Sequence, residues 1–361
     1  MKILSYIIVG SGHRAMFYAR IAKTYPDLFR AIFLCRSQEK VNLMQEKTGI
    51  PATTSLEDCK EFKADFIVVA VNKESIADVC EEWVKRGYPV AIETPAGTTI
   101  EQLSRLWNLH KQGAKITVFE QYHRYPLLAN GLKAIADGKI GTPSSAYLSL
   151  AHDYHAASLL KKLLLVNNES FVLRGIKLNN PVVETDSRNG IIDDGRIKSE
   201  DRKVICITYS SGKTAIYDFS SIQYRSFIRS RHLNVRGEKG EWNDNIIYYL
   251  DEHNNPHRDY LLPDIDPKYQ ELDTQTLRDI RKTWQSELYL DNIQDEFAIT
   301  TMLYDMQEYL NNGKEVYPLQ EALDDAYFWL LIDKAISSPW QEIKSEVMPW
   351  HDLKIICKKG Q

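Results

Sequence analysis

Short apolar runs alternate with amphipathic segments through the first third of the chain. Runs of this kind occupy residues 6–9, 31–35, 66–71, 90–92 and 116–119. They are almost entirely apolar rather than alternating, a pattern typical of strands that are buried on both faces of a parallel sheet. We therefore expect parallel strands at these places.

Helical periodicity fills the segments between these runs. One set of apolar residues follows the spacing i, i+3, i+4, i+7, i+8: Ile76, Val79, Cys80, Trp83 and Val84. Gly87 predicts the end of that helix, and Gly113 predicts the end of the next one. Thr98 and Glu101 are expected to form a capping box at the start of this second helix. Strand and helix in alternation, joined by short links, predict a doubly wound parallel sheet over residues 1–120.

The pattern changes beyond residue 120. Two pairs of short apolar segments, 204–209 with 214–219 and 233–235 with 241–242, flank the glycine-containing turns Ser-Ser-Gly-Lys and Gly-Glu-Lys-Gly. Each pair predicts an antiparallel hairpin. In the first strand Ile205, Ile207 and Tyr209 alternate with polar residues, so one face of the sheet is expected to be packed. The other face would be covered by helices or by a partner subunit.

Two helices are predicted to close the chain, over residues 291–310 and 319–337. Residues 243–272 are rich in Asp, Asn, His and Pro, and we expect them to form a long surface excursion. The fold class predicted from these patterns is an α/β domain of residues 1–120 followed by an α+β domain of residues 121–361. The second domain would be built on a largely antiparallel sheet.

Composition and charge narrow the class of protein. The 361 residues are 43% hydrophobic, enough for two domains with a core each. With 45 basic and 49 acidic residues the formal charge is −4, so neither nucleic acid nor an anionic membrane surface is expected as a partner. Five scattered cysteines without CxxC spacing favour a reducing, cytoplasmic setting. The apolar run 6–9 is too short for a signal peptide, and no run approaches the roughly 20 apolar residues of a membrane helix.

The first strand leads directly into a glycine turn, in the sequence SYIIVGSGHRA of residues 5–15. Gly10 would permit the tight turn, and Gly12 would let a pyrophosphate approach the backbone. Ala15 takes the third small position, where the helix packs on the strand. A helix beginning near His13 would direct its free N–H groups toward the phosphates. The turn predicts a dinucleotide site, the alternative being a plain glycine turn in an α/β domain.

Seven short motifs in this order resemble one known family. They are GSGHRA at 10–15, AIETPAG at 91–97, FEQYHRYP at 119–126, AHDYHAASLL at 151–160, TDSRNG at 185–190, SGKTAIYDFS at 211–220 and VRGEKGEW at 235–242. Together they are similar to the glucose-fructose oxidoreductase, inositol dehydrogenase and rhizopine-catabolism family, Gfo/Idh/MocA. The resemblance implies a Rossmann domain joined to an antiparallel-sheet domain, and nicotinamide-dependent oxidation of a sugar or polyol hydroxyl. It also implies a homo-oligomer, a dimer or tetramer, assembled through the open face of the C-terminal sheet.

One position departs from the family pattern. Members that oxidise alcohols usually carry Glu-Lys-Pro after the fifth strand, whereas this chain has Glu93-Thr94-Pro95. Thr94 can form hydrogen bonds but cannot act as a cationic relay. The loss of the lysine either shifts its work to another group or removes the redox activity.

The end of the second strand bears on the choice of cofactor. It reads Cys35-Arg36-Ser37, without the carboxylate that would accept the ribose hydroxyls of NAD. This favours NADP over NAD, although Arg36 could also be a solvated loop charge. The resemblance places Asn72 and Glu93 beside the nicotinamide, although either could instead cap a strand end. The complete set of expected cofactor-binding residues is Gly10, Gly12, His13, Arg14, Ala15, Arg36, Ser37, Asn72, Glu93, Thr94 and Gln121.

His155 is the first candidate for the catalytic base. It matches the histidine that the family uses beside the substrate, and a neutral imidazole can accept a hydroxyl proton. The family often has a carboxylate four residues earlier, where this chain has Ala151. If residues 151–155 are extended, Asp153 lies on the same side as His155 and could orient it. Asp153 could instead cap the following helix.

Further candidates surround this segment. Tyr122 matches a family position at the cleft and could hold a sugar oxygen, although an unshifted pKa of about 10 makes it a poor base. Thr185 and Arg188 are candidate substrate contacts, with a plain turn as the alternative. His152 and His155 form an HxxH pair, but no third ligand stands at a suitable spacing, so no metal site is expected.

The function expected from these residues is an NADP- or NAD-dependent oxidoreductase of carbohydrate metabolism. It would transfer a hydride between the cofactor and a hydroxyl of a sugar, sugar derivative or cyclitol. Two alternatives stay open: a lyase or glycosidase that oxidises its sugar transiently, and a non-catalytic sensor that binds the dinucleotide. The sequence leaves open which sugar and which hydroxyl are used.

Overall fold

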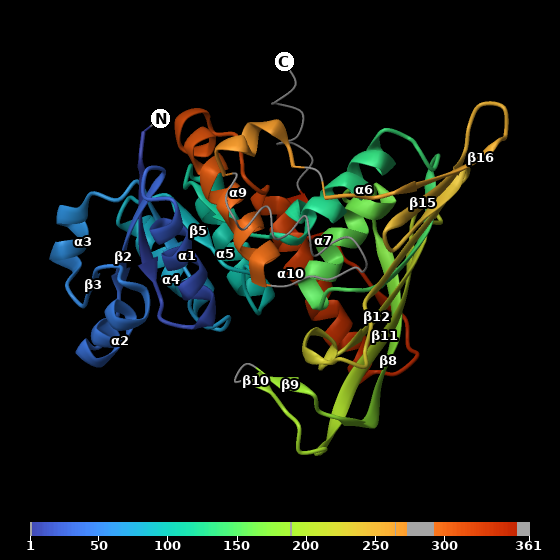
Figure 1. Ribbon diagram of the computed structural model, residues 1–361, viewed down its shortest axis with the longest axis horizontal. Helices are drawn as coiled ribbons and strands as arrows, with labels where there is room; N and C mark the ends of the chain where they lie inside the picture. The colour runs from blue at the N-terminus through green and yellow to red at the C-terminus, as the bar shows by residue number, and fades with distance from the viewer. Residues whose placement is uncertain (1, 188–189, 264, 273–291, 352–361) are drawn as a thin grey trace.

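The chain is built on two large sheets with helices between them in the view of Figure 1. The computed structural model describes residues 2–187, 190–263, 265–272 and 292–351. No helix among these residues is both long and apolar enough to cross a bilayer. The N-terminal sheet carries the glycine turn, and the larger C-terminal sheet carries the segment around His155.

The first sheet has six parallel strands. They are β1 (Leu4–Val9), β2 (Phe29–Leu34), β3 (Ala52–Thr53), β4 (Phe66–Val69), β5 (Val90–Ile92) and β6 (Ile116–Val118). Their order is β3-β2-β1-β4-β5-β6. The order of strands along the chain therefore switches sides between β1 and β4, as in a doubly wound dinucleotide fold. The predicted α/β fold class is confirmed. The two-residue β3 carries no apolar run, so the sequence pattern did not indicate it.

Five helices accompany this sheet within the described residues. They are α1 (His13–Thr24), α2 (Gln38–Thr48), α3 (Leu56–Phe62), α4 (Ile76–Lys85) and α5 (Ile100–Lys111). The predicted helix that ends before Gly87 is confirmed as α4. The predicted cap of α5 is wrong by one residue, because the Thr99 hydroxyl accepts the Gln102 backbone N–H. Thr98 instead donates its backbone N–H to the Gln102 side chain.

The second sheet has nine strands. They are β7 (Pro143–Ser149), β8 (Phe171–Val183), β11 (Ile197–Tyr209), β12 (Thr214–Ser220), β13 (His232–Gly237), β14 (Gly240–Asn243), β15 (Ile246–Leu250), β16 (Pro256–Tyr260) and β17 (Ile343–Lys344). Their order is β16-β15-β14-β13-β7-β12-β11-β8-β17, antiparallel except for the β12–β7 pair. Both predicted hairpins and the largely antiparallel sheet are confirmed. The short strands β9 (Asp186–Ser187) and β10 (Gly190–Ile191) pair separately.

The expected surface excursion at 243–272 is wrong for much of its length. Residues 246–250 and 256–260 form β15 and β16, which extend the sheet to its edge. An edge strand has one row of backbone groups facing outward, so it tolerates charged side chains and a proline at its first position, here Pro256. The polar composition therefore marked the edge of a sheet rather than a loop.

The remaining helices lie between the two sheets in Figure 1, and they are α6 (Pro126–Ala136), α7 (Asp153–Leu164), α9 (Asn292–Asn312) and α10 (Leu319–Ser337). Short 3-10 helices span Tyr122–Arg124, Gln223–Arg225, Pro267–Leu272 and Pro349–His351. Helices α7 and α10 pack on the inner face of the large sheet, where Ile205 and Ile207 are buried. The two closing helices are confirmed as α9 and α10; Asp291, the first residue of the former prediction, lies outside the described residues.

Helix α9 brings the chain back to the N-terminal half of the molecule. It packs against α1, and its Ile299, Met302 and Leu303 share a buried core with Phe17 and Tyr18. This return places the start of α9 beside the first helix, nearly 280 residues away in the sequence. The boundary between domains 1–120 and 121–361 stays a prediction.

Candidate active site

A cleft of about 1320 Å³ brings together the glycine turn and the segment around His155. It opens at the carboxyl ends of β1, β2, β4 and β5, where loops of a doubly wound sheet bind their ligand. Residues from the C-terminal half of the chain line it as well, in the segments 152–155 at the start of α7 and 224–231 before β13. The cleft is thus formed by both halves of the chain.

The glycine turn has the geometry that a pyrophosphate requires. Gly10 has a φ of +134°, and a Cβ there would lie 2.2 Å from the carbonyl oxygen of Ala70, so no larger residue fits. A Cβ on Gly12 would meet no atom within 4 Å, which leaves room for a ligand to approach the backbone. Gly12 is also the N-cap of α1 and offers no side chain to its first turn. Ala15 is buried behind the turn. These residues fit a dinucleotide.

Two cations line the cleft beyond the end of β2. Arg36 and Lys40 both line it, together with the apolar Leu34 and Leu56. Ser37 has a different task, because its hydroxyl accepts the Lys40 backbone N–H at 3.4 Å and caps α2. Lys40 was not among the residues expected from the sequence, since its position one helical turn beyond Arg36 has no motif of its own.

Arg14 and Glu93 form an ion pair in the cleft. Arg14 Nε lies 2.9 Å from Glu93 Oε1, and Arg14 Nη1 lies 2.9 Å from Asp295 Oδ2. The Tyr18 hydroxyl donates to the same Glu93 oxygen at 2.5 Å. Glu93 is only 5% exposed, so its carboxylate is held by neighbours rather than by water. Arg14 therefore joins the end of β5 to α9.

Asp295 lines the cleft, although no sequence motif indicated it. It accepts hydrogen bonds from Gln121 Nε2, at 3.1 Å, and from the Tyr125 hydroxyl. Burial would raise the pKa of this carboxyl, but Arg14 and these two donors bring it below its usual range. The expected residues Asn72, Thr94 and Gln121 also line the cleft, as does His13.

His155 is buried at the start of α7 and contacts a carboxylate. Its Nδ1 lies 2.5 Å from Oε2 of Glu120, which lies two residues beyond the end of β6. Glu120 is 1% exposed and His155 4% exposed. The other Glu120 oxygen accepts the Tyr122 backbone N–H at 3.1 Å, which fixes the carboxylate in place. The sequence analysis missed Glu120, although it lies in the quoted FEQYHRYP motif, because no spacing links it to His155.

The expected pairing of Asp153 with His155 is wrong. Residues 151–155 are not extended: α7 begins at Asp153, which has a φ of +44°, so strand alternation does not apply. Asp153 Oδ1 instead lies 2.7 Å from the ammonium of Lys203. The carboxylate beside His155 is that of Glu120, which follows a strand of the N-terminal sheet. Ala151, where the family often has a carboxylate, is buried.

Tyr122 belongs to a hydrogen-bonded cluster around Tyr224. The Tyr122 hydroxyl donates to the Tyr224 hydroxyl at 2.8 Å, and the His152 backbone N–H donates to it at 2.9 Å. His152 Nδ1 also lies 2.8 Å from that oxygen. The rings of Tyr122 and His152 have centroids 4.5 and 4.9 Å from that of His155. Tyr224, absent from the sequence predictions, thus connects the groups around the candidate base.

Burial sets the protonation of this cluster. It raises the pKa of Tyr122 and of Tyr224 well above the ordinary value, so both hydroxyls stay protonated. It lowers the pKa of His155 and of His152 to about 3, and raises the pKa of Glu120 to about 8. His155 is therefore a neutral imidazole that can accept a proton, and Tyr122 is suited to hydrogen bonding rather than to base catalysis.

The remaining predictions concern the loop residues Thr185 and Arg188 and the possibility of a metal site. The Thr185 hydroxyl accepts the Phe227 backbone N–H at 3.0 Å, and Arg188 lies outside the described residues. Among the residues that the structure describes, no three His, Cys, Asp or Glu side chains gather as metal ligands would.

Comparison with known proteins gives one family match. Residues 4–122 match the Gfo/Idh/MocA model, described as an oxidoreductase family with an NAD-binding Rossmann fold. No curated protein matches the sequence.

Solved structures resemble the whole chain. An NAD-binding oxidoreductase from Klebsiella pneumoniae has a TM-score of 0.70 at 14% identity, over 96% of this chain and 100% of that one. A myo-inositol dehydrogenase from Corynebacterium glutamicum has a TM-score of 0.67 at 15% identity, over 96% of this chain and 100% of that one. The WlbA dehydrogenase from Bordetella pertussis, in complex with NADH and UDP-GlcNAcA, has a TM-score of 0.67 at 16% identity, over 96% of this chain and 99% of that one. At such identities the likeness shows the fold. The resemblance in the sequence is confirmed over residues 4–122, which match the model of the Gfo/Idh/MocA oxidoreductase family, and the chain has the two-sheet fold of these structures.

Proposed function

We propose that the protein is an NAD(P)-dependent oxidoreductase that acts on a hydroxyl of a sugar, sugar derivative or cyclitol. The observation that carries this proposal is the single cleft that holds both the glycine turn and His155. A dinucleotide with its pyrophosphate at Gly10–Gly12 can extend past Asn72 and Glu93 toward the histidine. A myo-inositol dehydrogenase and a dehydrogenase with a bound UDP-sugar acid share the fold.

His155 is the base of the proposed reaction. The nicotinamide, when bound, supplies the hydride acceptor or donor, and the protein must take up or return the hydroxyl proton. Because Nδ1 of His155 contacts Glu120, Nε2 is the nitrogen that accepts this proton. The Glu120 carboxylate holds the imidazole in the matching tautomer and stabilises the positive charge that it gains. Thr94 offers a hydroxyl to the substrate where the family lysine would offer a cation.

NADP is the proposed cofactor. Arg36 and Lys40 line the cleft after β2, where the 2′-phosphate of a bound dinucleotide would lie. The carboxylate that would accept ribose hydroxyls is absent from residues 35–37. A doubly charged phosphate gains more from two adjacent cations than an uncharged hydroxyl does.

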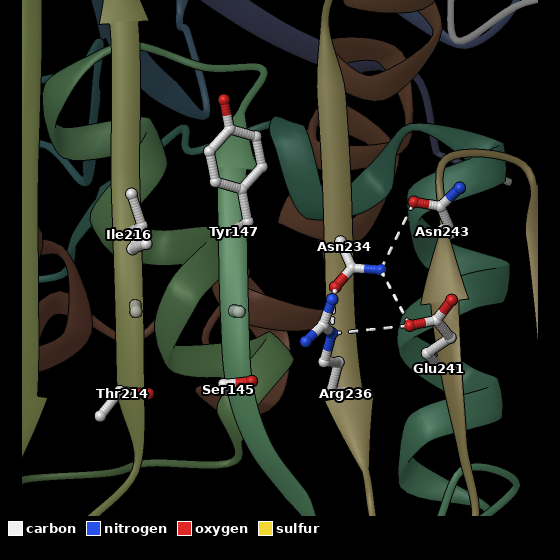
Figure 2. A pocket seen from close by; sticks show the side chains of 10 residues that line it. Ser145, Tyr147, Thr214, Ile216, Asn234, Arg236, Glu241 and Asn243 are labelled. Carbon is white, nitrogen blue, oxygen red and sulfur yellow. Dashed lines mark hydrogen bonds and ion pairs between the residues drawn. The ribbon is translucent and has the colours of Figure 1, made fainter.

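A homo-oligomer is proposed through the outer face of the large sheet. A hollow of about 550 Å³ lies on this face and is lined by residues of β12, β7, β13 and β14. Figure 2 shows the side chains along these strands. Tyr147 and Ile216 project from this face, and Ile216 is 42% exposed. Asn234, Arg236 and Glu241 form a polar group beside them. A second copy in a dimer or tetramer would cover the apolar part of this face.

The proposal is tested by measuring hydride transfer directly. Purified protein is mixed with NADP or NAD and with pools of hexoses, sugar acids, glycosides and cyclitols, and the absorbance of the reduced nicotinamide is followed. We expect a signal that depends on one pool and is larger with NADP. Dinucleotide binding without any absorbance change, and with no glycoside cleavage, would contradict the oxidoreductase and leave a sensor.

A further inference from the structure

Two arginines, Arg225 and Arg231, line the cleft together with Tyr224. Arg231 places its guanidinium carbon 5.0 Å from the centroid of the Tyr224 ring, and Arg225 follows Tyr224 in the chain. Arg225 Nη1 donates to the carbonyl of Ser187 at 3.3 Å, and it lies 3.7 Å from Oδ2 of Asp186. The tyrosine face and the β9 segment thus hold the two guanidinium groups at the wall of the cleft.

This pair is close to the candidate base. The Tyr224 hydroxyl contacts Tyr122 and His152, whose rings stand against that of His155. Tyr224, followed by Tyr122 and His152, connects Arg231 to His155, and all of these residues line the same cleft. A ligand that presents a hydroxyl to His155 can therefore present a second group to the arginines.

The charges that line the cleft fall into separate groups. Arg14 is engaged by Glu93 and Asp295, and Arg36 and Lys40 lie at the cofactor end. Around Tyr224 the charged lining groups are Arg225, Arg231 and Asp186, and the Asp186 carboxylate lies 3.7 Å from Arg225. Burial raises the pKa of Tyr122 and of Tyr224, and the positive charge of Arg231 partly offsets this rise.

We propose that the substrate carries an anionic group, a carboxylate or a phosphate, which Arg225 and Arg231 bind while its hydroxyl faces His155. A guanidinium presents a planar pair of N–H donors that matches either group, which a neutral sugar hydroxyl does not. The substrate class is then a sugar acid or a sugar phosphate rather than a neutral hexose or cyclitol. This inference rests on the proposed function, since it assumes that the substrate lies between the cofactor and the arginines.

The test compares matched ligands in the protein preloaded with NADPH. Calorimetric titration measures the dissociation constant of each neutral sugar beside its uronic acid, its aldonic acid and its phosphate, at low and high salt. We expect one class of anion to bind about tenfold or more tightly than its neutral partner, as a charge-assisted contact implies, and to lose much of that advantage in high salt. Comparison of the sugar acids with the sugar phosphate shows whether the site binds a carboxylate or a phosphate.

Three variants assign the effect to the arginines. Arg231→Gln and Arg225→Gln should each reduce the preference for the anion about tenfold, and Arg231→Lys should restore part of it. Arg196→Gln is the matched control, because Arg196 is an arginine outside the cleft lining that is paired with Glu184. An anion that binds no better than its neutral partner, or a preference that both glutamine variants retain, overturns the inference. Failure of NADPH to bind overturns the proposed function instead, and oxidation of neutral sugars alone overturns only the substrate class.

Discussion

At the scale of single residues, the cleft combines groups whose chemistry depends on burial. His155 is neutral because burial makes an imidazolium costly, and Glu120 is held against it although burial disfavours a carboxylate. The pair therefore exchanges a proton as a unit, and its two titrations belong to both side chains. Two predictions follow from this contact.

Replacement of the base should separate chemistry from binding. His155→Ala is expected to lower kcat by about 10²–10⁴, the usual contribution of a positioned general base. The dissociation constant for NADPH, measured by nicotinamide fluorescence, should change less than twofold, because the glycine turn is untouched. A large loss of NADPH affinity in a folded variant would contradict the role of His155.

The Glu120 contact predicts the pH dependence of alcohol oxidation. The pKa of Glu120 is raised to about 8, so the pair holds an extra proton below this pH and releases it above. Oxidation needs the deprotonated pair, so kcat/KM for oxidation should rise with pH through about 8, and the reverse reduction should fall. The charges of Arg14 and Lys162 lower the pKa of Glu120 and the charge of Asp295 raises it, so these three residues are left unchanged in this experiment. Glu120→Gln should abolish the rise near pH 8 and lower kcat about 10²–10³, since an amide does not stabilise the imidazolium.

A matched control distinguishes this effect from general destabilisation. Glu200 is likewise buried, 3% exposed, but it pairs with Arg229 on the large sheet outside the cleft lining. Glu200→Gln is compared in the same buffers, with the melting temperature measured for both variants. A pH profile that shifts equally in the two variants would show that Glu120 has only a structural role.

At the scale of elements, the junctions after β1 and β2 determine cofactor binding. Gly10→Ala should destabilise the fold by more than the roughly 1–3 kcal/mol that backbone strain costs, because the new Cβ meets the Ala70 carbonyl at 2.2 Å. Gly12→Ala meets no atom and should fold normally, yet lose NADPH affinity because its methyl occupies the approach to the backbone. Thermal unfolding and NADPH titration of both variants check this contrast. Equal affinity in Gly12→Ala and the wild type would exclude the turn as the pyrophosphate site.

The β2–α2 junction should discriminate between the two nicotinamide dinucleotides. Arg36→Ala is expected to weaken NADPH binding about tenfold or more and to leave NADH binding nearly unchanged, because only NADPH carries the 2′-phosphate. Lys40→Ala should act in the same direction. The measurement is the ratio of the two dissociation constants, with Lys60→Ala, on the exposed surface of α3, as a control of equal charge change. Equal weakening of both cofactors would contradict the NADP preference.

At the scale of the whole molecule, the outer face of the large sheet should hold subunits together. Ile216→Asp places a charge in the apolar part of that face and is expected to dissociate the oligomer, while the folded chain keeps its melting transition. Val347 is 88% exposed and lies outside this face, so Val347→Asp is the matched control. Sedimentation velocity measures the change. An unchanged sedimentation coefficient for Ile216→Asp would place any interface elsewhere.

The sequence by itself determined the elements that depend on local pattern. The strands of the first sheet other than β3 follow from continuous apolar runs, and the helices α4 and α10 from their periodicity, because burial on one face or two imposes the spacing directly. The glycine turn was identifiable for the same reason, since Gly10 and Gly12 meet a requirement of their own backbone. His155 and Tyr122 were identifiable through the resemblance to a family.

The tertiary structure alone decided which groups meet in the cleft. Glu120 and His155 lie 35 residues apart, and Arg14 and Asp295 lie 281 apart, so no sequence period connects either pair. Asp153 was misplaced because residues 151–155 are not extended: α7 begins at Asp153, whose carboxylate contacts Lys203. Charge pairing across two sheets depends on how whole elements pack, and that packing is a property of all of them together rather than of any one segment.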